Sequence, residues 1–183
     1  MAKNDSNIRI YGDEEATVWV APKGTELPDD LAALAAPYAD AGLLGEDGIE
    51  FEGEPETVEV RVHNGFRIAR TKITGGKQTV KIVCSETNAI TNGLMYPAAV
   101  VTTTAGVTRI DNKEKFVSDE RVFVIEDYDV DIHTRTVITR GEVTERGTVV
   151  QKADKETIFE FTITSYGAIY TLTNDAALAV AAA

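Results

Sequence analysis

The sequence contains one cysteine, one tryptophan and two histidines among 183 residues. A single cysteine excludes an internal disulfide framework and is typical of a reducing compartment. No apolar run approaches the roughly 18 residues that a membrane-spanning helix needs, so we expect no membrane anchor. The first residues, MAKNDSNIRI, are polar and lack the apolar core of a secretory signal. These absences predict a globular protein that folds in the cytoplasm where it is made.

Positive charge is also scarce. Lysine and arginine number 18 against 30 aspartate and glutamate residues, which gives a formal net charge of −12 and a calculated isoelectric point near 4.6. Affinity for nucleic acid comes mainly from lysines and arginines that neutralise phosphates. The composition therefore argues against tight binding to DNA or RNA.

Residue patterns that carry chemistry are few. His63 and His133 lie at polar positions of strand-like stretches, with no serine or cysteine partner indicated by spacing. The acidic run at residues 126–131 resembles a calcium loop only superficially, because Ile132 and Ile138 occupy the positions that require glycine and glutamate. Neither GxxxxGK nor GxGxxG occurs. We expect no catalytic residues, no metal site and no cofactor, and hence a protein that is not an enzyme.

Alternation of apolar and polar residues is the dominant local pattern, and it predicts strands with one buried face. Asn64-Gly65 favours a hairpin turn because both residues tolerate positive φ, and TGGK at residues 74–77 favours a second turn. We therefore expect a three-stranded antiparallel meander over residues 58–84. Further strands are predicted at residues 17–20, 121–127, 134–143 and 157–165.

Helical patterns are short. Ser85 or Asn88 can cap a helix that ends before Pro97. A second helical piece is predicted from Asp29 to Pro37, where a proline ends it. The length is enough for one domain with a hydrophobic core. We assign it to residues 1–173 and expect the alanine-rich residues 174–183 to form either a capped helical turn or a mobile tail.

Charged residues are segregated along the chain. From residue 24 to residue 60 there are eleven acids and no base, and from residue 60 to residue 85 there are six bases and no acid. Such blocks suit either a solvated surface or a surface that meets copies of itself, and charge alone does not choose between the two. The acidic block comprises Glu46, Asp47, Glu50, Glu52, Glu54, Glu56 and Glu59. The basic block comprises Arg61, Arg67, Arg70, Lys72, Lys77 and Lys81.

Three stretches, taken in order, resemble the major tail proteins of long-tailed actinobacteriophages. VWVAPKGTELP followed by LLGEDGIEF is similar to the opening strand, turn and linker of that family. KQTVKIVCSETNAI resembles its strand that runs into a helix cap. RGEVTERGTVVQKADKETIFEFTITSY resembles its closing hairpin. The basic stretch at residues 67–72 departs from the family pattern, and we expect no immunoglobulin-like C-terminal domain of the kind found in some relatives.

The resemblance implies an antiparallel β-barrel or sandwich with one flanking helix and extended loops. It also implies assembly as hexameric rings stacked into a tail tube, the conduit for DNA ejection, in a virion assembled in the bacterial cytoplasm. A tape-measure protein, a tail terminator and tail-tip proteins would be the partners, and DNA would pass through the lumen without tight binding. We expect residues 45–57 to form an extended loop between subunits.

Two other interpretations remain open. A neck or head-decoration protein would form a single ring or trimer. A monomeric β-sandwich binding module would share the strand pattern and the acidity, but it would need a concave aromatic-lined site, for which Trp19 alone is weak support. The charge blocks also allow two arrangements. We predict that both blocks are subunit-interface residues, with residues 46–59 of one subunit against residues 61–81 of a neighbour; the alternative is that both blocks pair within one subunit.

Residues 45–57 combine three glycines and one proline with six acids, and they have little to bury. We therefore predict fast amide hydrogen exchange for this segment in the free subunit and slow exchange in assembled tubes. Hydrogen exchange followed by mass spectrometry measures both states. Equal protection in the two states would contradict the prediction that residues 45–57 become ordered on assembly.

Overall fold

The computed structural model describes residues 4–179. The protein is mainly β, with 52% strand and 9% helix. Its strands are β1 (Thr17–Pro22), β2 (Ala39–Asp40), β3 (Leu44–Arg61), β4 (Ile68–Cys84), β5 (Val100–Thr104), β6 (Val107–Asp111), β7 (Glu120–Asp129), β8 (Ile132–Arg146), β9 (Phe159–Ser165) and β10 (Ile169–Thr173). One α-helix, α1 (Ala89–Met95), and three short 3-10 turns accompany them. No helix within residues 4–179 is long and apolar enough to cross a membrane.

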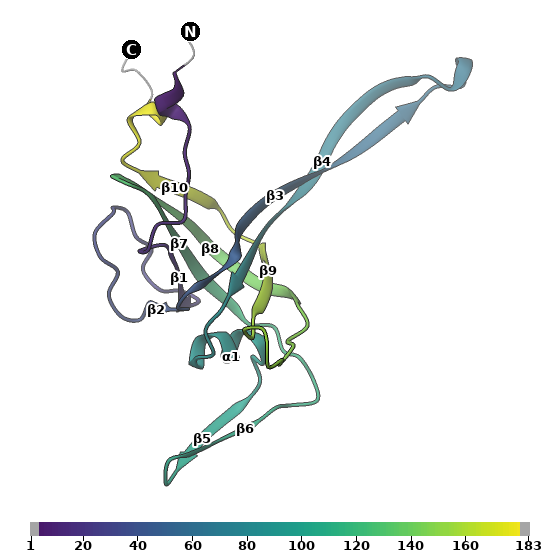
Figure 1. Ribbon diagram of the computed structural model, residues 1–183. Coiled ribbons are helices and arrows are strands. Elements are labelled where there is room, and N and C mark those ends of the chain that lie inside the picture. Colours follow the sequence, from purple (N-terminus) through teal and green to yellow (C-terminus); the bar gives the residue numbers. More distant parts are fainter. Residues whose placement is uncertain (1–3, 180–183) are drawn as a thin grey trace.

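Eight strands form one antiparallel sheet in the order β2-β1-β7-β8-β9-β4-β3, and β10 pairs with β8. Strands β5 and β6 form a separate two-stranded sheet. Figure 1 shows the β3–β4 hairpin leaving the body on one side, and the β5–β6 hairpin projecting below α1, at the end of the body away from both termini. The mainly antiparallel β class predicted from the alternation pattern is confirmed.

The sheet buries both of its faces. The larger core lies on the side of α1 and joins Ile82 and Cys84 of β4 to Phe123 of β7 and Phe161 of β9. The second core contains Val122, Val124 and Val137, against which Trp19, Tyr38 and Tyr170 pack. Strand β7 contributes to both cores, because the side chains of its apolar run from Val122 to Ile125 point alternately to the two faces of the sheet and all are buried. Burial on two sides therefore fixes the centre of the sheet.

A buried ion pair connects the second core to the segment 25–38. Arg135 is 1% exposed, and its Nε donates a hydrogen bond to Glu126 at 2.7 Å. Its Nη1 and Nη2 donate to the backbone carbonyl oxygens of Asp30 at 2.7 Å and Ala32 at 2.8 Å. The indole Nε1 of Trp19 donates to the other carboxylate oxygen of Glu126 at 2.9 Å. The guanidinium thus holds the segment 25–38 over this face of the sheet.

Most predicted elements have counterparts in the structure. The strands expected at 17–20, 121–127, 134–143 and 157–165 correspond to β1, β7, β8 and β9. Asn88 caps α1: its side chain accepts hydrogen bonds from the backbone N–H groups of Ile90 and Thr91. The Asn64-Gly65 turn is also present, with Gly65 at φ 75°. Near the C-terminus, Asp175 caps a 3-10 turn at Ala176–Leu178, and residues 180–183 of the expected tail lie outside the described residues.

The helix predicted from Asp29 to Pro37 is wrong, because this segment is irregular. A helix would use the carbonyl oxygens of Asp30 and Ala32 for its own hydrogen bonds. In the structure both oxygens accept from Arg135 instead. A buried cation from a distant strand therefore overrides the local preference.

The turn predicted at residues 74–77 is also wrong, so the three-stranded meander is a single two-stranded hairpin. Strand β4 continues through Gly75 and Gly76, which pair with Glu56 and Pro55 of β3. Neither glycine has positive φ. A Cβ atom at Gly76 would lie 3.3 Å from the Glu54 carbonyl oxygen, so glycine permits a close approach of the two backbones beside a proline.

Residues 45–57, expected to be an extended loop, belong to β3, because β4 supplies pairing partners from Ile49 onward. The loop that the fast-exchange prediction assumes for the free subunit is therefore a paired strand over residues 49–57. Strand pairing depends more on such a partner than on local propensity. Three further elements were not predicted: the β5–β6 hairpin, β2 and β10. The hairpin turns at Ala105-Gly106, with φ of 50° and 79°, so its glycine was a usable signal.

Replacing Arg135 with alanine should lower the free energy of unfolding by about 3–5 kcal/mol, because the buried carboxylate of Glu126 would lose its partner. Urea denaturation followed by circular dichroism measures this change. The control is Arg109→Ala, which removes an arginine that is 76% exposed and should cost at most about 1 kcal/mol. Equal midpoints for the two variants would contradict the role assigned to Arg135.

Candidate assembly surfaces

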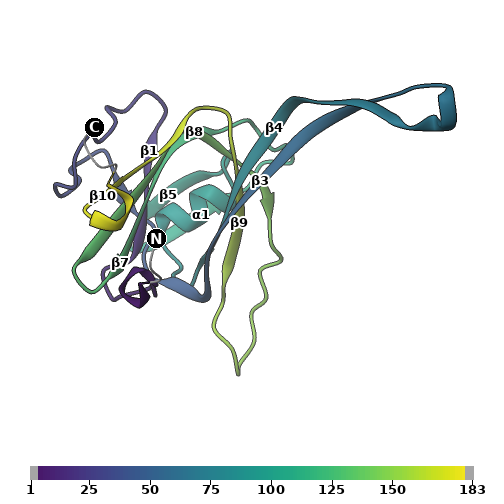
Figure 2. The same ribbon diagram turned by 90° about the horizontal axis from the view of Figure 1, so that it is seen from above.

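Strands β3 and β4 continue beyond the body as a two-stranded arm, defined here as residues 53–78 (Figure 2). Strand β9 pairs with β4 only from Thr79 to Cys84, so the arm has no third strand. Its apolar side chains face solvent, including Phe66 at the tip and Ile73. A two-stranded hairpin is at best marginally stable in water. The arm is therefore the first candidate for a surface that contacts another chain.

Near the body, the acidic and basic blocks face each other within one chain. The β3–β4 register places Glu50 opposite Lys81 and Glu54 opposite Lys77. Lys81 Nζ also forms an ion pair with Glu160 of β9 at 3.1 Å, and this bond raises the pKa of Lys81. Exposed pairs of this kind contribute about 0–1 kcal/mol each. Near the body, these positions are consistent with pairing of the acidic and basic blocks inside one subunit.

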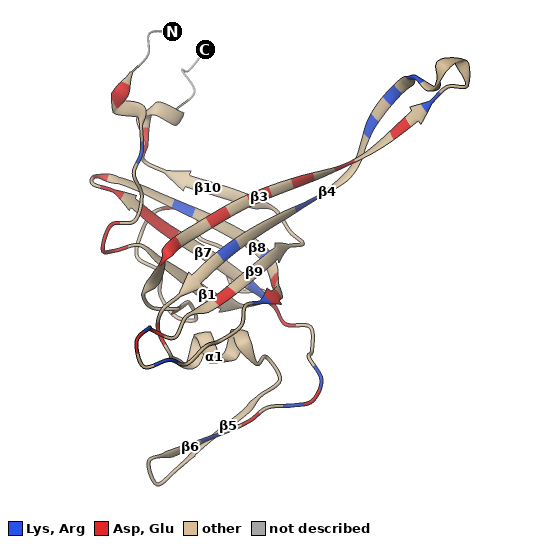
Figure 3. Cartoon of the chain, turned by 45° about the vertical axis from the view of Figure 1, so that its right-hand side comes forward, with Lys and Arg blue, Asp and Glu red and all other residues tan. Residues whose placement is uncertain are grey.

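The outer arm has a different arrangement. Arg70 and Lys72 lie opposite Val60 and Val58, and Arg67 follows the tip. Within residues 4–179 these three bases form no ion pair, whereas Arg61 pairs with its neighbour Glu59 at 3.1 Å. Figure 3 shows the bases gathered on the outer arm and the acids spread along the hairpin toward the body. The outer arm therefore carries cations without carboxylate partners.

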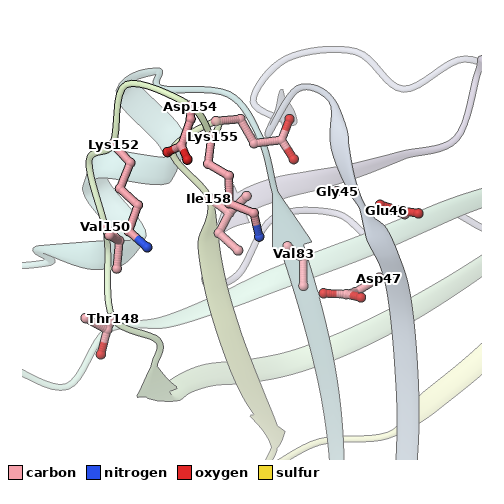
Figure 4. Close-up of a pocket in the computed structure, with 11 residues that line it drawn as sticks. Gly45, Glu46, Asp47, Val83, Thr148, Val150, Lys152, Asp154, Lys155 and Ile158 are labelled. Atoms are coloured by element: carbon pink, nitrogen blue, oxygen red, sulfur yellow. The ribbon is translucent and has the colours of Figure 1, made fainter.

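Two members of the acidic block line a cavity of about 580 Å³. Glu46 and Asp47 contribute from the start of β3, and Lys152, Asp154 and Lys155 contribute from the loop after β8 (Figure 4). The remaining acids, Glu52 and Glu56, lie opposite Thr79 and Gly75, so the register gives them no base. The acidic block is thus divided between the cavity and the exposed hairpin.

The sheet also leaves a long free edge. Strand β3 is the terminal strand of the order and spans 18 residues. An unpaired edge presents a row of backbone N–H and C=O groups that can pair with another chain. The six glutamates of β3 and Pro55 limit unspecific pairing, because charge and proline are common protections of edge strands. Edge pairing between copies therefore requires a partner that accommodates these residues.

No arrangement typical of an active site is present in the described part of the chain. His63 is exposed near the arm tip. His133 stacks on Tyr128 with ring centroids 4.3 Å apart and lies 3.6 Å from Glu126; burial lowers the pKa of His133. Between residues 4 and 179, no group of three or more His, Cys, Asp or Glu side chains could hold a metal ion. The charged surfaces, rather than a pocket, are the candidate functional features.

Comparison with known proteins identifies one family. A sequence model described as "Phage tail tube protein" matches residues 1–179. No curated protein matches the chain. Among solved structures, a chain from the "virion of native gene transfer agent (GTA) particle" aligns with a TM-score of 0.44 at 11% identity, over 93% of this chain and 99% of that chain.

Cys84 should be unreactive in the folded protein, because burial raises the pKa of its thiol to about 12 and the thiolate is the reactive form. At pH 8 only about one thiol in 10⁴ would be ionised. We predict negligible alkylation by iodoacetamide at pH 8 and complete alkylation in 6 M guanidinium. Mass spectrometry of the two samples distinguishes this result from rapid alkylation of the native protein.

Proposed function

Since the chain belongs to the phage tail tube protein family, we propose that it polymerises as stacked hexameric rings into the tail tube of a long-tailed actinobacteriophage. The protein is a structural component of the virion tail, in a family that is not an enzyme family. In the proposed role the tube is the conduit for DNA ejection into the host. The subunits are made and assembled in the bacterial cytoplasm.

The arm is the observation that carries this proposal. It extends beyond the last residue that β9 pairs with, and its apolar side chains Phe66 and Ile73 are largely exposed to solvent. A contact between the arm of one subunit and the body of another uses two different patches. Such heterologous contacts propagate into rings or filaments, which is the geometry that a tube requires.

The charge pattern supports contact between the blocks of neighbouring subunits. Near the body, acids and bases of the two blocks lie opposite each other in one chain. In the outer arm, the strand register places no carboxylate opposite Arg67, Arg70 or Lys72. In the proposed assembly these bases lie against acids of the acidic block of a neighbour. Charges at the rim of an interface mainly set register and association rate. Salt should therefore slow assembly more than it weakens the finished tube.

The acidity of the subunit suits a conduit for DNA. A lumen with few cations gives phosphates little to bind, because nucleic-acid affinity depends on lysine and arginine contacts. The net charge of −12 therefore favours passage over retention. The further partners in this role are a tape-measure protein inside the tube, a terminator at the head end and tip proteins at the other end.

Two other functions predict different assemblies. A neck or head-decoration protein would stop at a single ring or trimer, and a monomeric binding module would stay monomeric at high concentration. Negative-stain electron microscopy of the concentrated purified protein distinguishes the three: long tubes support the proposal. Single rings or monomers at every concentration would contradict it.

Reversing Arg67, Arg70 and Lys72 to glutamate should abolish tube formation while leaving a folded subunit, because like charges would then face the acidic block of a neighbour. Reversing Glu50, Glu52 and Glu54 to lysine in the same chain should restore part of the assembly. Sedimentation and negative-stain microscopy measure the polymer, and circular dichroism checks the fold.

The matched control reverses Arg109, Lys113 and Lys115, which produces the same change in net charge on exposed residues at the other end of the body. This control should form tubes. If the arm variant also forms normal tubes, the charge blocks are surface charge only, and apolar contacts and strand edges hold the subunits together.

A further inference from the structure

The β5–β6 hairpin is a second projection, separate from the arm. Its two strands pair with each other and with no strand of the main sheet. Figure 1 shows it beyond α1, at the end of the body opposite the terminal segments. Two strands alone are marginally stable. The hairpin therefore gains little from its own chain.

The two faces of this hairpin differ in charge. Residues directly opposite each other in an antiparallel pair share a face. One face contains Val101 and Ile110, followed by Thr103 and Thr108, whose hydroxyl oxygens lie 3.0 Å apart in a hydrogen bond. This uncharged face is open to solvent, with Val101 54% and Ile110 43% exposed.

The other face carries the charges of the hairpin. Arg109 and Asp111 form an ion pair at 2.8 Å there. Val100 and Val107 lie on this same charged face, opposite Asp111 and Thr104 respectively. The hairpin thus has one uncharged face without a partner and one charged face suited to solvent.

The opposite end of the body carries a matching uncharged patch. Arg9 turns inward and forms two hydrogen bonds of 2.7 Å with Asp175, which ties the N-terminal segment to the C-terminal 3-10 turn. Because successive side chains of an extended segment point to opposite sides, Ile8 and Ile10 point outward. They are 68% and 78% exposed, and Leu178 on the adjoining turn is 66% exposed. These three residues form the terminal patch.

We propose that the uncharged face of the β5–β6 hairpin docks on the terminal patch of the next copy along the tube. This inference rests on the proposed function. The two surfaces lie at opposite ends of the body in Figure 1 and Figure 3, as a head-to-tail contact requires. The hairpin face of each copy would then meet the terminal patch of the next copy throughout the stack.

Charge favours the terminal patch over the arm as the surface that contacts the uncharged face of the β5–β6 hairpin. Docking the outer arm would bury Arg67, Arg70 or Lys72 against a face that offers no carboxylate, which is costly. The terminal patch has no such cost, because Arg9 is already paired with Asp175. The docked pair removes apolar side chains of both copies from water.

Disulfide trapping tests the contact directly. Purified Ile10→Cys subunits are mixed with epitope-tagged Ile110→Cys subunits, assembled into tubes and oxidised. Because Cys84 is buried, the new thiols are the accessible ones. We expect a mixed dimer on a non-reducing gel from tubes and none from unassembled subunits. The matched control pairs Ile10→Cys with Val107→Cys of the charged face. Absence of the mixed dimer in tubes, or equal dimer with the control pair, would overturn the inference.

A charge variant separates this inference from the proposed function. Val101→Glu with Ile110→Glu should leave a folded subunit, by circular dichroism, and reduce sedimentable tubes more than about 10-fold, because two carboxylates would be buried without partners. Val100→Glu with Val107→Glu on the charged face should assemble as wild type. If the first variant forms normal tubes, this inference fails and the tube function stands. If the wild-type chain forms no tubes at any concentration, both fail.

Discussion

The positions of the arm and of the charge blocks depend on the pairing of β3 with β4, which runs from Leu44 to Arg61 with register shifts after Leu44, Glu56 and Val60. Strand β4 ends in the core, where Ile82 and Cys84 are fully buried and β9 covers its second edge. The same strand begins at the far end of the arm. Because the same two strands run from the body into the arm, the core sets the direction in which the arm leaves the body. Gly76 lets the two backbones approach closely beside Pro55, because a Cβ atom there would lie 3.3 Å from the Glu54 carbonyl oxygen.

The charges of the protein are distributed according to the same strand pairing. Near the body, the register places Glu50 opposite Lys81 and Glu54 opposite Lys77. An exposed pair at such a position would stabilise the subunit only slightly. Where the hairpin leaves the body, Arg70 and Lys72 face valines. The segregated charges therefore have two outcomes. Acids and bases lie opposite each other near the body, and the outer arm is cationic. The outer arm therefore has cations available for contact with a second chain.

The buried polar groups hold the body together in a different way. Arg135 and Glu126 connect β7, β8 and the segment 25–38 through hydrogen bonds that leave both charges partnered. Such a pair adds less net stability than an apolar core, but losing one partner is expensive. It fixes how the segment 25–38 covers the second core.

The sequence by itself determined the β class, four strands of the main sheet and the Asn64-Gly65 turn, and it limited the cap of α1 to Ser85 or Asn88, because each depends on side chains within a few residues of one another. The blocks of charge were also visible, but not which charges would be paired. Tertiary structure decided that the TGGK stretch is strand, since Pro55 and Glu56 of a distant segment pair with it. It also decided that residues 29–37 are not helical, since Arg135 takes their carbonyl oxygens. In both cases the partner lies far away in the chain, and hydrogen bonds that close only in the folded protein override the local preference.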